Sequence, residues 1–202
     1  MKIICVGRNY RKHAQELGNE VPAEPVIFMK PDSAILRQRD AFYIPDFTND
    51  VHYEAEIVVK LNRLGKRIQQ KFAHKYYAQF TVGIDFTARD VQSELKAKGL
   101  PWEKAKGFDS SAVCGEWLNV SDYDINNLNF ELKKNGETVQ QGNTKDMLFS
   151  VDALIENTSQ YFTLKIGDQI FTGTPEGVGP VASGDILEGY VEGLKVLQVK
   201  VK

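Results

Sequence analysis

The sequence predicts an α+β fold that is mostly β. Short apolar runs of strand length recur along the 202 residues, whereas few segments show helical periodicity. Glycine and proline separate these runs, and strands do not alternate regularly with long helices. The length, with 42% apolar and 26% charged residues, fits a single domain over residues 1–202 with a full core.

Elements in the first half are delimited by stop signals. Gly18 is expected to end a helix over residues 10–17, and Gly99 is expected to end a helix over residues 88–98. A further helix is predicted over residues 71–79. The predicted strands, in chain order, cover residues 2–6, 25–30, 42–44, 51–61 and 80–86.

The second half is expected to contain a hairpin, one helix and a strand-rich end. Asn135-Gly136 is a strong signal for a type I′ turn between strands over residues 128–133 and 137–141. Ser150 is the expected N-cap of a helix that runs to about residue 161. The stretch around Trp102 is expected to be a loop. Glycine-rich turns separate the last predicted strands, which cover residues 169–172, 186–192 and 194–201.

The composition argues against several classes of function. A net charge of −2 offers no basic excess for nucleic acid or an anionic membrane. The two cysteines, Cys5 and Cys114, neither form a disulfide framework nor show metal-ligand spacing. The chain shows no signal peptide and no apolar run of membrane-spanning length. We therefore expect a cytoplasmic protein with no nucleic-acid or membrane partner.

Glu54 and Glu56, one residue apart in a predicted strand, are the most informative feature of the chain. Side chains alternate between the faces of a strand, so both carboxylates point the same way, with Cα atoms roughly 6 to 7 Å apart. Asp85, on another predicted strand, would complete an all-oxygen set of ligands. Such a set suits Mg²⁺, Mn²⁺ or Ca²⁺ rather than zinc.

The two glutamates also have a simpler interpretation. They fit the solvated side of an edge strand, and taken alone they favour it. His52 shares their face and would be either a neighbour or a ligand. The opposite face is mostly apolar, as in a half-buried strand, and consists of Val51, Tyr53, Ala55, Ile57 and Val59.

His13 and Glu16 lie three residues apart on the first predicted helix and therefore share a face. A carboxylate that holds one imidazole nitrogen leaves the other to act as a general base. For one such pair, a solvated surface contact is the more common arrangement. The surrounding segment is polar, so the helix would be mobile, and a mobile helix that carries a base would act as a lid.

Arg89 and Gln92 follow the third acid and share a face of the next predicted helix, with Thr87 as its expected N-cap. Arg89 suits two-pronged capture of a carboxylate. Pairing with Asp90 or Glu94 on a solvated helix is equally compatible with the sequence. These residues therefore favour substrate binding only in combination with the neighbouring acids.

Two further candidates lie in glycine-containing segments. Lys106 precedes Gly107 and would hold an anionic substrate or stabilise an enolate; alone, it would be an ordinary loop lysine. Thr174 lies in FTGTPEGVGPV, whose glycines permit close backbone approach or simply a tight turn. The chain has no G-x-S-x-G elbow, P-loop or dinucleotide fingerprint, which argues against covalent catalysis through Ser or Cys.

The chain resembles the fumarylacetoacetate hydrolase family in short motifs that run in order from Cys5 to about Gly193. The resemblance implies a mixed β-roll with short helices, of the compact type without a large N-terminal domain. It also implies a divalent-metal site and a homodimer. The motifs are CVGRNYRKHAQELG, PVIFMKP, HYEAEIVV, VGIDFTARDVQ, WEKAKGFD, NGETVQQGNTKDM and FTGTPEGVGPV.

The resemblance also implies roles for individual residues. The metal would be Mg²⁺ or Mn²⁺, with Ca²⁺ as another possible occupant, and Lys30 would support the site. The implied metal ligands are Glu54, Glu56 and Asp85; the implied catalytic residues are His13, Glu16 and Lys106; the implied substrate contacts are Arg89, Gln92, Thr174 and Lys30.

These roles predict chemistry on a 2-oxo acid. Three carboxylates would leave metal positions open for the acid and for water, and the cation would stabilise an enolate. Water activated by His13 and Glu16 would cleave an acylpyruvate such as fumarylpyruvate or acetylpyruvate. The same site would also suit an oxaloacetate decarboxylase or an enol–keto isomerase. The His–Glu pair favours the hydrolase, and a non-catalytic dimer that binds a small oxo acid ranks last.

Overall fold

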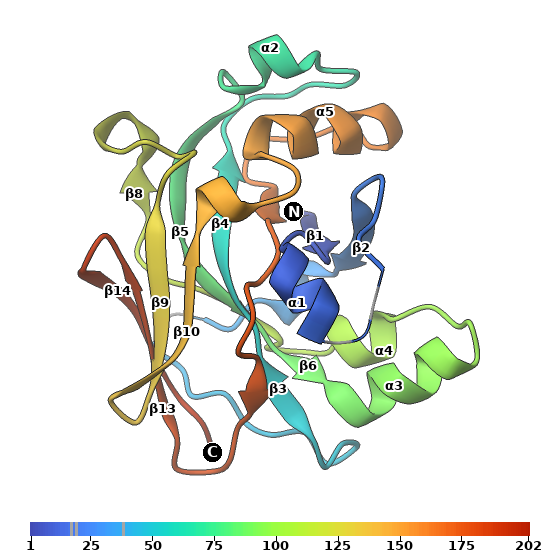
Figure 1. Ribbon diagram of the computed structural model, residues 1–202, viewed down its shortest axis with the longest axis vertical. Helices are drawn as coiled ribbons and strands as arrows, with labels where there is room; N and C mark the ends of the chain where they lie inside the picture. Colours follow the sequence, from blue (N-terminus) through green and yellow to red (C-terminus); the bar gives the residue numbers. More distant parts are fainter. Residues whose placement is uncertain (17, 19, 38) are drawn as a thin grey trace.

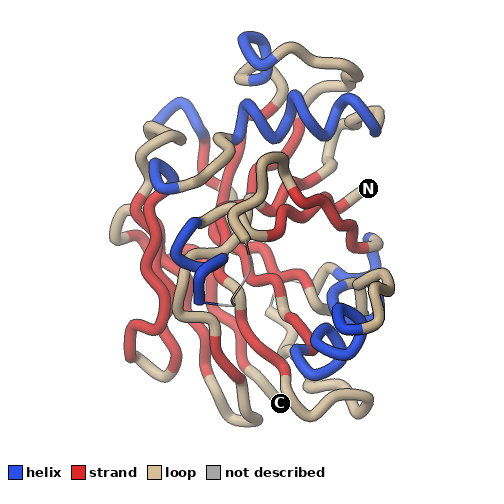
Figure 2. The backbone as a smooth tube through the Cα atoms, turned by 45° about the vertical axis from the view of Figure 1, so that its right-hand side comes forward, coloured by secondary structure: helices blue, strands red, loops and turns tan. Residues whose placement is uncertain are grey.

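The structure is a computed structural model that describes residues 1–16, 18, 20–37 and 39–202. Strands form the body of the molecule (Figure 1), and short helices lie at its periphery (Figure 2). Strand accounts for 37% of the residues and helix for 21%. These shares confirm the prediction of a mostly β chain.

A seven-stranded sheet carries the candidate site. In this sheet β1 pairs with β11 in parallel, and the other pairs are antiparallel. β8 (Leu118–Asn119) pairs with β5 beside the main path. The main path runs β2 (Val26–Lys30), β1 (Ile3–Gly7), β11 (Gln169–Phe171), β4 (Ala55–Leu61), β5 (Tyr77–Asp85) and β7 (Ala112–Cys114).

Two smaller sheets contain the remaining strands. The predicted hairpin is confirmed, since Asn135 and Gly136 both adopt positive φ, 54° and 87°, as a type I′ turn requires. The four-stranded sheet runs β10 (Glu137–Asn143), β9 (Asn129–Lys134), β13 (Ile186–Val191) and β14 (Leu194–Lys200). The three-stranded sheet runs β12 (Gly179–Pro180), β3 (Val51–Tyr53) and β6 (Thr87–Ala88).

Both faces of β4 are buried. Ile57 and Val59 belong to the larger core cluster, whereas Val58 packs with Cys5 and Phe171 in a smaller cluster. Alternate residues of a strand face opposite sides, so the acid-bearing face is also covered by protein. β4 lies between β11 and β5 and is therefore a central strand, not the edge strand of the simpler interpretation.

The helices are short and connect or cover the sheets (Figure 2). Ser150 caps α5 as predicted, with its Oγ accepting a 3.3 Å hydrogen bond from the Ala153 N–H. Residue 17, the expected end of the first helix, lies outside the described residues. The helices are α1 (Arg11–Glu16), α2 (Gln70–Ala73), α3 (Arg89–Ala97), α4 (Glu103–Lys106) and α5 (Val151–Tyr161), with 3₁₀ turns at Asp32–Ala34, Val120–Asp122 and Thr144–Asp146.

The helix predicted over residues 71–79 is wrong. α2 ends at Ala73, and β5 begins at Tyr77. Tyr77 is buried and pairs with Leu61 of β4, so packing of an aromatic residue on the sheet outweighs the local helical pattern.

Two predicted strands also differ from the structure. Residues 42–44 form no strand, because only a single bridge joins Phe42 to Val201. The strand predicted over residues 51–61 is interrupted at Glu54, which separates β3 from β4. This interruption leads the chain from the small sheet into the large one at the position of the first acid.

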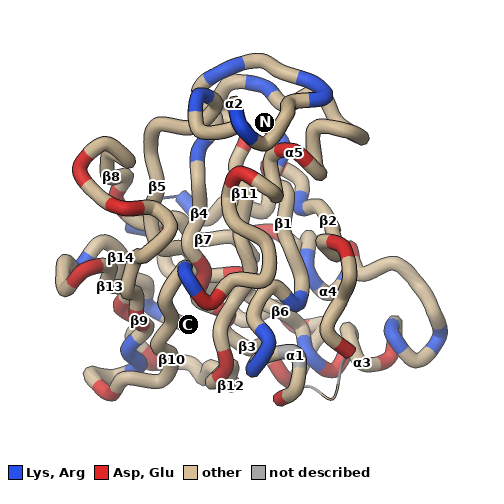
Figure 3. The backbone as a smooth tube through the Cα atoms, turned by 45° about the horizontal axis from the view of Figure 1, so that its top comes forward, with Lys and Arg blue, Asp and Glu red and all other residues tan. Residues whose placement is uncertain are grey.

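Lys and Arg residues are interspersed with Asp and Glu residues along the backbone (Figure 3). Within the part of the chain that the structure describes, no helix combines the length and the apolar character that crossing a membrane demands.

Candidate metal centre and active site

The three predicted metal ligands converge. Glu54 connects β3 to β4, Glu56 lies in β4, and Asp85 ends the neighbouring β5. The Asp85 N–H donates a 2.8 Å hydrogen bond to the Glu54 carbonyl, which brings the end of β5 beside both glutamates. Oxygens of the three carboxylates lie within 4.8 Å of one another, and all three residues are buried. The solvated-strand interpretation is therefore wrong.

Three cations face these carboxylates. Lys106 Nζ lies 2.8 Å from Glu54 Oε2 and 2.8 Å from Asp85 Oδ2. Arg89 Nη2 donates a 2.6 Å hydrogen bond to Glu54 Oε1. Lys30 Nζ lies 2.7 Å from Asp85 Oδ1. The three positive charges balance the three acids when all of the acids are ionised, which offsets much of the penalty for burying them.

Lys30 supports Asp85 from within the protein. Its side chain is fully buried, and its ammonium donates to the Lys106 carbonyl and, at 2.9 Å, to Ser111 Oγ. Lys30 lies at Asp85 Oδ1 and Lys106 lies at Asp85 Oδ2, so each oxygen of this carboxylate faces an ammonium group. Lys30 therefore fixes the position of Asp85.

The buried charges shift the pKa values of the two glutamates in opposite directions. Burial raises the pKa of Glu54, but Lys106 and Arg89 outweigh it, so this pKa lies below its ordinary value. Glu56 forms no ion pair with a described residue. Burial, reinforced by the charges of Asp85 and Glu54, holds the pKa of Glu56 well above its ordinary value.

Lys106 remains cationic at neutral pH. Burial lowers its pKa, but the charges of Asp85 and Glu54 outweigh this and raise the pKa above the ordinary value. Lys106 is therefore suited to holding an anion and not to accepting a proton.

The residues of the site fit a divalent cation bound through oxygen. Three buried carboxylates are the hard ligands that Mg²⁺ and Mn²⁺ prefer. The charge of Glu56 has no partner cation among the described residues, and the charges of Asp85 and Glu54 repel it. A bound cation would relieve this repulsion, because it supplies positive charge among the acids.

The glycine-rich loop over residues 171–181 contacts Glu56 directly. The Gly173 N–H donates a 2.8 Å hydrogen bond to Glu56 Oε2. Gly173 adopts a φ of +101°, and a Cβ there would lie 2.7 Å from Asn9 Cβ. A residue with a side chain would clash in this position, so glycine is required for the loop to reach Glu56.

His13 faces the carboxylates from α1. It is 5% exposed and lines the same cavity as Glu54 and Glu56. Its Nδ1 lies 3.3 Å from Glu16 Oε2, which leaves Nε2 as the nitrogen that can accept a proton. The pairing predicted from the sequence is confirmed, and His13 is not a solvated surface residue.

α1 contacts the glycine-rich loop through polar side chains. Glu16 Oε1 accepts a 3.1 Å hydrogen bond from the Gly177 N–H. Lys12 forms an exposed 3.3 Å ion pair with Glu176. These few contacts would allow α1 to detach while the core remains intact.

Arg89 and Gln92 lie together beside the carboxylate triad, as predicted. Arg89 Nη1 donates a 2.6 Å hydrogen bond to Gln92 Oε1, while its Nη2 binds Glu54. The alternative partners are engaged elsewhere, because Asp90 accepts from Thr48 and Glu94 pairs with Lys98. The solvated-helix interpretation of Arg89 is therefore wrong.

Thr87 is not the N-cap of α3, contrary to the prediction. The N-cap is Ala88, which has no side-chain hydrogen bond to offer. Thr87 Oγ1 instead accepts a 2.6 Å hydrogen bond from Lys106 Nζ. Lys106 itself ends the short helix α4, in a stretch that was expected to be a loop.

A small cavity gives access to the site. Its volume is about 40 Å³, enough for roughly three water molecules. A larger cavity of about 670 Å³, lined by Arg11, Lys12 and residues of β9 and β10, contains none of the three carboxylates. The predicted site residues that line the small cavity are His13, Glu54, Glu56, Arg89, Gln92, Lys106 and Thr174, whereas Glu16, Lys30 and Asp85 stand behind them.

Gln140 is a site residue that the sequence analysis missed. Its Oε1 accepts a 2.8 Å hydrogen bond from the Ala55 N–H, and its Nε2 donates to Thr174 Oγ1 at 2.9 Å and to the Pro175 carbonyl at 3.0 Å. A register shift between Thr138 and Gln140 in β10 aims it inward. Gln140 and Gln141 are adjacent in a strand, so the sequence indicates that one of the two amides faces the core. It does not indicate which one, because the bulge that turns Gln140 inward has no sequence signature.

Other residues that line the cavity were also missed, and four of them have large side chains. Phe28 and Trp102 form an aromatic wall with ring centroids 5.8 Å apart. Arg8 and Lys96 add two cations to the lining. The four residues come from separate segments of the chain, so no local pattern could have grouped them.

The comparison with known proteins identifies the family. The family model described as the C-terminal part of fumarylacetoacetate hydrolase matches residues 2–202. The chain belongs to the fumarylacetoacetate hydrolase family. The resemblance drawn from the short motifs is thereby confirmed.

Similar members of the fumarylacetoacetate hydrolase family are enzymes. Oxaloacetate tautomerase YcgM of Escherichia coli (strain K12) is 42% identical over 194 residues, which cover 95% of this chain and 89% of that protein. The mitochondrial oxaloacetate decarboxylase of Dictyostelium discoideum is 42% identical over 195 residues, which cover 96% and 89%.

A solved structure from the family shows the same fold. Fumarylpyruvate hydrolase from Pseudomonas aeruginosa, in complex with Mn²⁺ and pyruvate, superposes with a TM-score of 0.94 at 35% identity, covering 100% of this chain and 89% of that one. The predicted family-type fold is therefore confirmed.

Proposed function

We propose that the protein is a divalent-metal-dependent enzyme that interconverts the keto and enol forms of an oxaloacetate-type 2-oxo acid. The observation that carries this proposal is the buried carboxylate triad, which shares one cavity with Lys106 and His13. Similar proteins named oxaloacetate tautomerase and oxaloacetate decarboxylase support the substrate type. The Mn²⁺ and pyruvate of the similar hydrolase structure support the metal and the 2-oxo acid.

Glu54, Glu56 and Asp85 would hold Mg²⁺ or Mn²⁺. When bound, the cation supplies positive charge opposite the oxygens of the 2-oxo acid, which acidifies the adjacent carbon. Lys106 and Arg89 orient the anionic end of the acid through their fixed positive charges. This arrangement stabilises the charge that develops when the carbon loses its proton.

His13 would move the proton. Glu16 holds Nδ1, so Nε2 takes the proton from the carbon next to the 2-oxo group and returns it to the enol oxygen. One C–H bond breaks and one O–H bond forms, so the reaction needs no further reactant. A cavity of about 40 Å³ is smaller than a four-carbon dicarboxylic acid, so α1 opens for binding and closes for proton transfer.

Hydrolysis of an acylpyruvate is the second candidate, and decarboxylation of oxaloacetate is the third. The His13–Glu16 pair favours hydrolysis because it can activate water, and the similar fumarylpyruvate hydrolase agrees with this role. The similar oxaloacetate decarboxylase supports loss of CO₂, which leads to the same enolate.

A parallel assay separates the three reactions. The purified protein with Mg²⁺ is given oxaloacetate, fumarylpyruvate and acetylpyruvate, and enol–keto conversion, CO₂ release and pyruvate release are followed with and without EDTA. The proposal predicts that EDTA-sensitive tautomerisation of oxaloacetate is the fastest of these reactions. Faster pyruvate release from an acylpyruvate would move the assignment to hydrolase, and faster CO₂ release would move it to decarboxylase.

A His13→Ala variant tests the proposed proton carrier. The tautomerase assignment predicts that His13→Ala loses most of the enol–keto conversion. Mn²⁺ binding should be unchanged, because His13 is not one of the proposed metal ligands. Loss of acylpyruvate cleavage with full retention of tautomerisation would instead assign His13 to water activation alone.

A further inference from the structure

We propose that one end of the molecule docks on an anionic lipid bilayer, through exposed lysines and arginines that surround exposed apolar side chains. This surface, called the α2 face, consists of residues 62–76 and the neighbouring segment 161–166, at the end of the molecule that carries α2 (Figure 1). The proposal concerns a binding partner and not the reaction, so it does not depend on the proposed function.

Residues 62–76 differ in charge from the rest of the chain. They contain five Lys or Arg residues and no Asp or Glu, whereas the whole chain has a net charge of −2. In Figure 3, the loop that carries α2 is marked by Lys and Arg alone. The whole-chain charge, from which we expected no membrane partner, is therefore an average that hides a basic segment.

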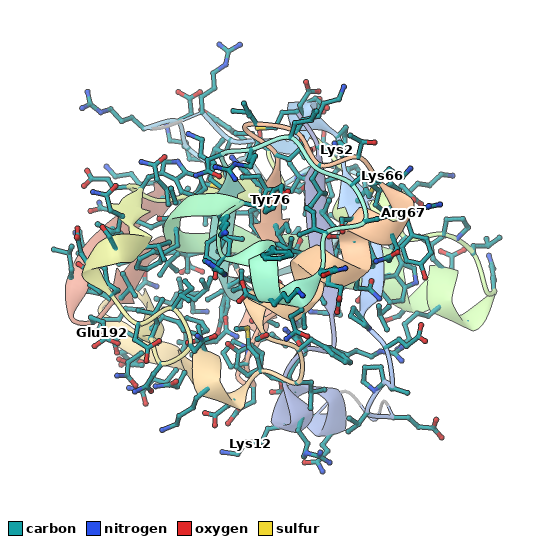
Figure 4. All side chains as sticks on the ribbon, turned by 90° about the horizontal axis from the view of Figure 1, so that it is seen from above. Lys2, Lys12, Lys66, Arg67, Tyr76 and Glu192 are labelled. Carbon is teal, nitrogen blue, oxygen red and sulfur yellow. The ribbon has the colours of Figure 1, made fainter. Side chains whose placement is uncertain are left out.

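The cations of the α2 face are exposed, and none of them forms an ion pair with a described residue. Asp152 and Glu156, the acids of the adjoining α5, accept 3.0 Å hydrogen bonds from the Tyr77 hydroxyl and the Gln70 N–H. Figure 4 looks down on this end and places Lys66 and Arg67 beside Tyr76. The cations of the face are Arg63, Lys66, Arg67, Lys71, Lys75 and Lys165.

Apolar side chains protrude among these cations. Single exposed apolar residues are common on protein surfaces, but four within one basic face are typical of a binding surface. The ring of Phe72 lies between two ammonium groups, with Lys71 Nζ 5.0 Å and Lys75 Nζ 5.3 Å from its centre. The exposed fractions of the four side chains are 64% for Leu64, 45% for Phe72, 63% for Tyr161 and 72% for Ile166.

The two segments form one continuous face. A β-bridge joins Gly65 to Leu164, with N–H···O hydrogen bonds of 3.0 and 2.8 Å. Leu64 precedes this bridge on one segment, and Ile166 follows it on the other. The Arg67 N–H also donates a 2.8 Å hydrogen bond to the Ser159 carbonyl of α5. The cations and the apolar side chains are therefore presented together.

An anionic bilayer is the partner that uses both parts of the α2 face. The cations match its headgroups, while the apolar side chains enter the boundary between headgroups and acyl chains. A nucleic acid would use the cations and leave the apolar side chains in water. A second copy of the same face would place like charges opposite one another. A bilayer also accepts protruding side chains without a matching pocket, which a protein partner would have to provide.

Docking through the α2 face would leave the catalytic cavity accessible. No residue of this face lines the small cavity of the carboxylate triad or the larger cavity beside α1. In Figure 1, α1, α3 and α4 lie away from α2. Variants of the α2 face should therefore keep the wild-type turnover.

The first test is co-sedimentation of the purified protein with lipid vesicles. The vesicles contain phosphatidylcholine alone, or phosphatidylcholine and phosphatidylglycerol in equal parts. We expect binding to the anionic vesicles only, weakened at about 1 M salt, where charges are screened beyond about 3 Å. Each Lys or Arg near an anionic surface raises the binding constant roughly fivefold. The combined variant Lys66→Gln, Arg67→Gln and Lys71→Gln should therefore bind about a hundredfold more weakly.

The matched control is the combined variant Lys145→Gln, Lys200→Gln and Lys202→Gln. These three lysines are exposed and lie outside the α2 face, and the control loses the same amount of charge. It should bind the anionic vesicles about as tightly as the wild type. Equal loss of binding in both combined variants would assign the binding to net charge and overturn the proposal.

Ile166→Ser tests whether apolar side chains enter the bilayer. It keeps every charge and should weaken binding about tenfold, because one large apolar side chain no longer leaves water. Leu194→Ser, at a leucine that is 48% exposed in β14, is the control and should bind like the wild type. No binding to anionic vesicles, or binding that Ile166→Ser leaves unchanged, would overturn the proposal. Tighter binding to poly-glutamate than to the anionic vesicles would also overturn it and assign the α2 face to an acidic protein.

Discussion

Glu56 differs from the other two carboxylates of the site, because no described cation pairs with it. Glu54 is paired with Arg89 and Lys106, and Asp85 is paired with Lys30 and Lys106. Glu56 accepts a single backbone hydrogen bond from Gly173. Without a bound cation, the charge of Glu56 therefore destabilises the folded protein, whereas the charges of its neighbours are compensated.

The metal-free protein should become more stable when Glu56 loses its charge. Glu56→Gln keeps the shape of the side chain and removes the repulsion, so we expect the free energy of unfolding at pH 7 to increase. Urea unfolding in the presence of EDTA measures this free energy. Glu54→Gln is the control and should lower the free energy of unfolding, because it leaves the charges of Lys106 and Arg89 uncompensated. A shift in the same direction for both variants would contradict this assignment of charges.

The raised pKa of Glu56 also predicts a pH dependence. Because the folded protein holds this proton more tightly than the unfolded chain, stability should fall as pH rises from the ordinary glutamate pKa of 4.5 toward the raised value. Urea unfolding in EDTA between pH 5 and pH 8 should show this decline, and Glu56→Gln should flatten it. Affinity for Mn²⁺ should rise over the same range, because binding releases the proton. A wild-type slope retained in the variant would assign the decline to another group.

Gln140 should be essential for the position of Thr174. Two backbone groups fix its amide, since the Ala55 N–H can only donate and the Pro175 carbonyl can only accept. Thr174 therefore accepts from Gln140 and keeps its own proton for a ligand in the cavity. We expect Gln140→Met to cost about 1–3 kcal/mol of stability, from the buried N–H left unpaired, and to weaken binding of 2-oxo acids.

The exposed neighbour Gln141 provides the control for that variant. Gln141→Met should leave both thermal unfolding and ligand binding near wild type. Similar behaviour of the two variants would show that Gln140 does not position the site.

At the scale of elements, the contact between α1 and the glycine-rich loop determines whether the cavity is closed. Gly177 provides the N–H that binds Glu16, and it adopts a φ of +93°. A Cβ at this position would lie 2.5 Å from the Val139 carbonyl. The loop therefore has no room for a side chain at the point where it holds α1.

Gly177→Ala should release α1 without unfolding the core. We expect faster hydrogen exchange of α1 (Arg11–Glu16), measured by mass spectrometry, with unchanged exchange in β4. Gly184→Ala is the matched control, because Gly184 also has a positive φ, +98°, but nothing within 4 Å. It should show only the backbone strain, about 1 kcal/mol, and no change in α1. Equal exchange of α1 in both variants would contradict its attachment through Gly177.

Elements with strong local signals were predicted well. The Asn135-Gly136 turn and the Ser150 cap appear as expected, because each depends on residues adjacent in sequence. The prediction of a helix over residues 71–79 was wrong, because Tyr77 is stabilised by packing in the sheet beside Leu61 of β4. The interruption of the strand at Glu54 and the bulge before Gln140 follow from three-dimensional packing and have no local signature.

At the scale of the whole molecule, the predicted site residues were brought together by long-range pairing. Family motifs named the three acids, the His–Glu pair and Lys106, and the structure places them around one small cavity. They contain Gln140 but give no sign of its contacts, which join segments far apart in the chain. The homodimer implied by the resemblance stays a prediction, because the structure contains one chain.

The most direct test of the account is Mn²⁺ binding by the wild type and by Glu56→Gln, followed through the electron paramagnetic resonance signal of free Mn²⁺. Glu137→Gln, at an exposed glutamate of β10, serves as the control. We predict one Mn²⁺ per chain in the wild type and the control, and an affinity at least about tenfold lower in Glu56→Gln, which corresponds to about 1.4 kcal/mol. Equal affinity in all three proteins, or no binding by the wild type, would contradict the assignment of Glu54, Glu56 and Asp85 as the metal site.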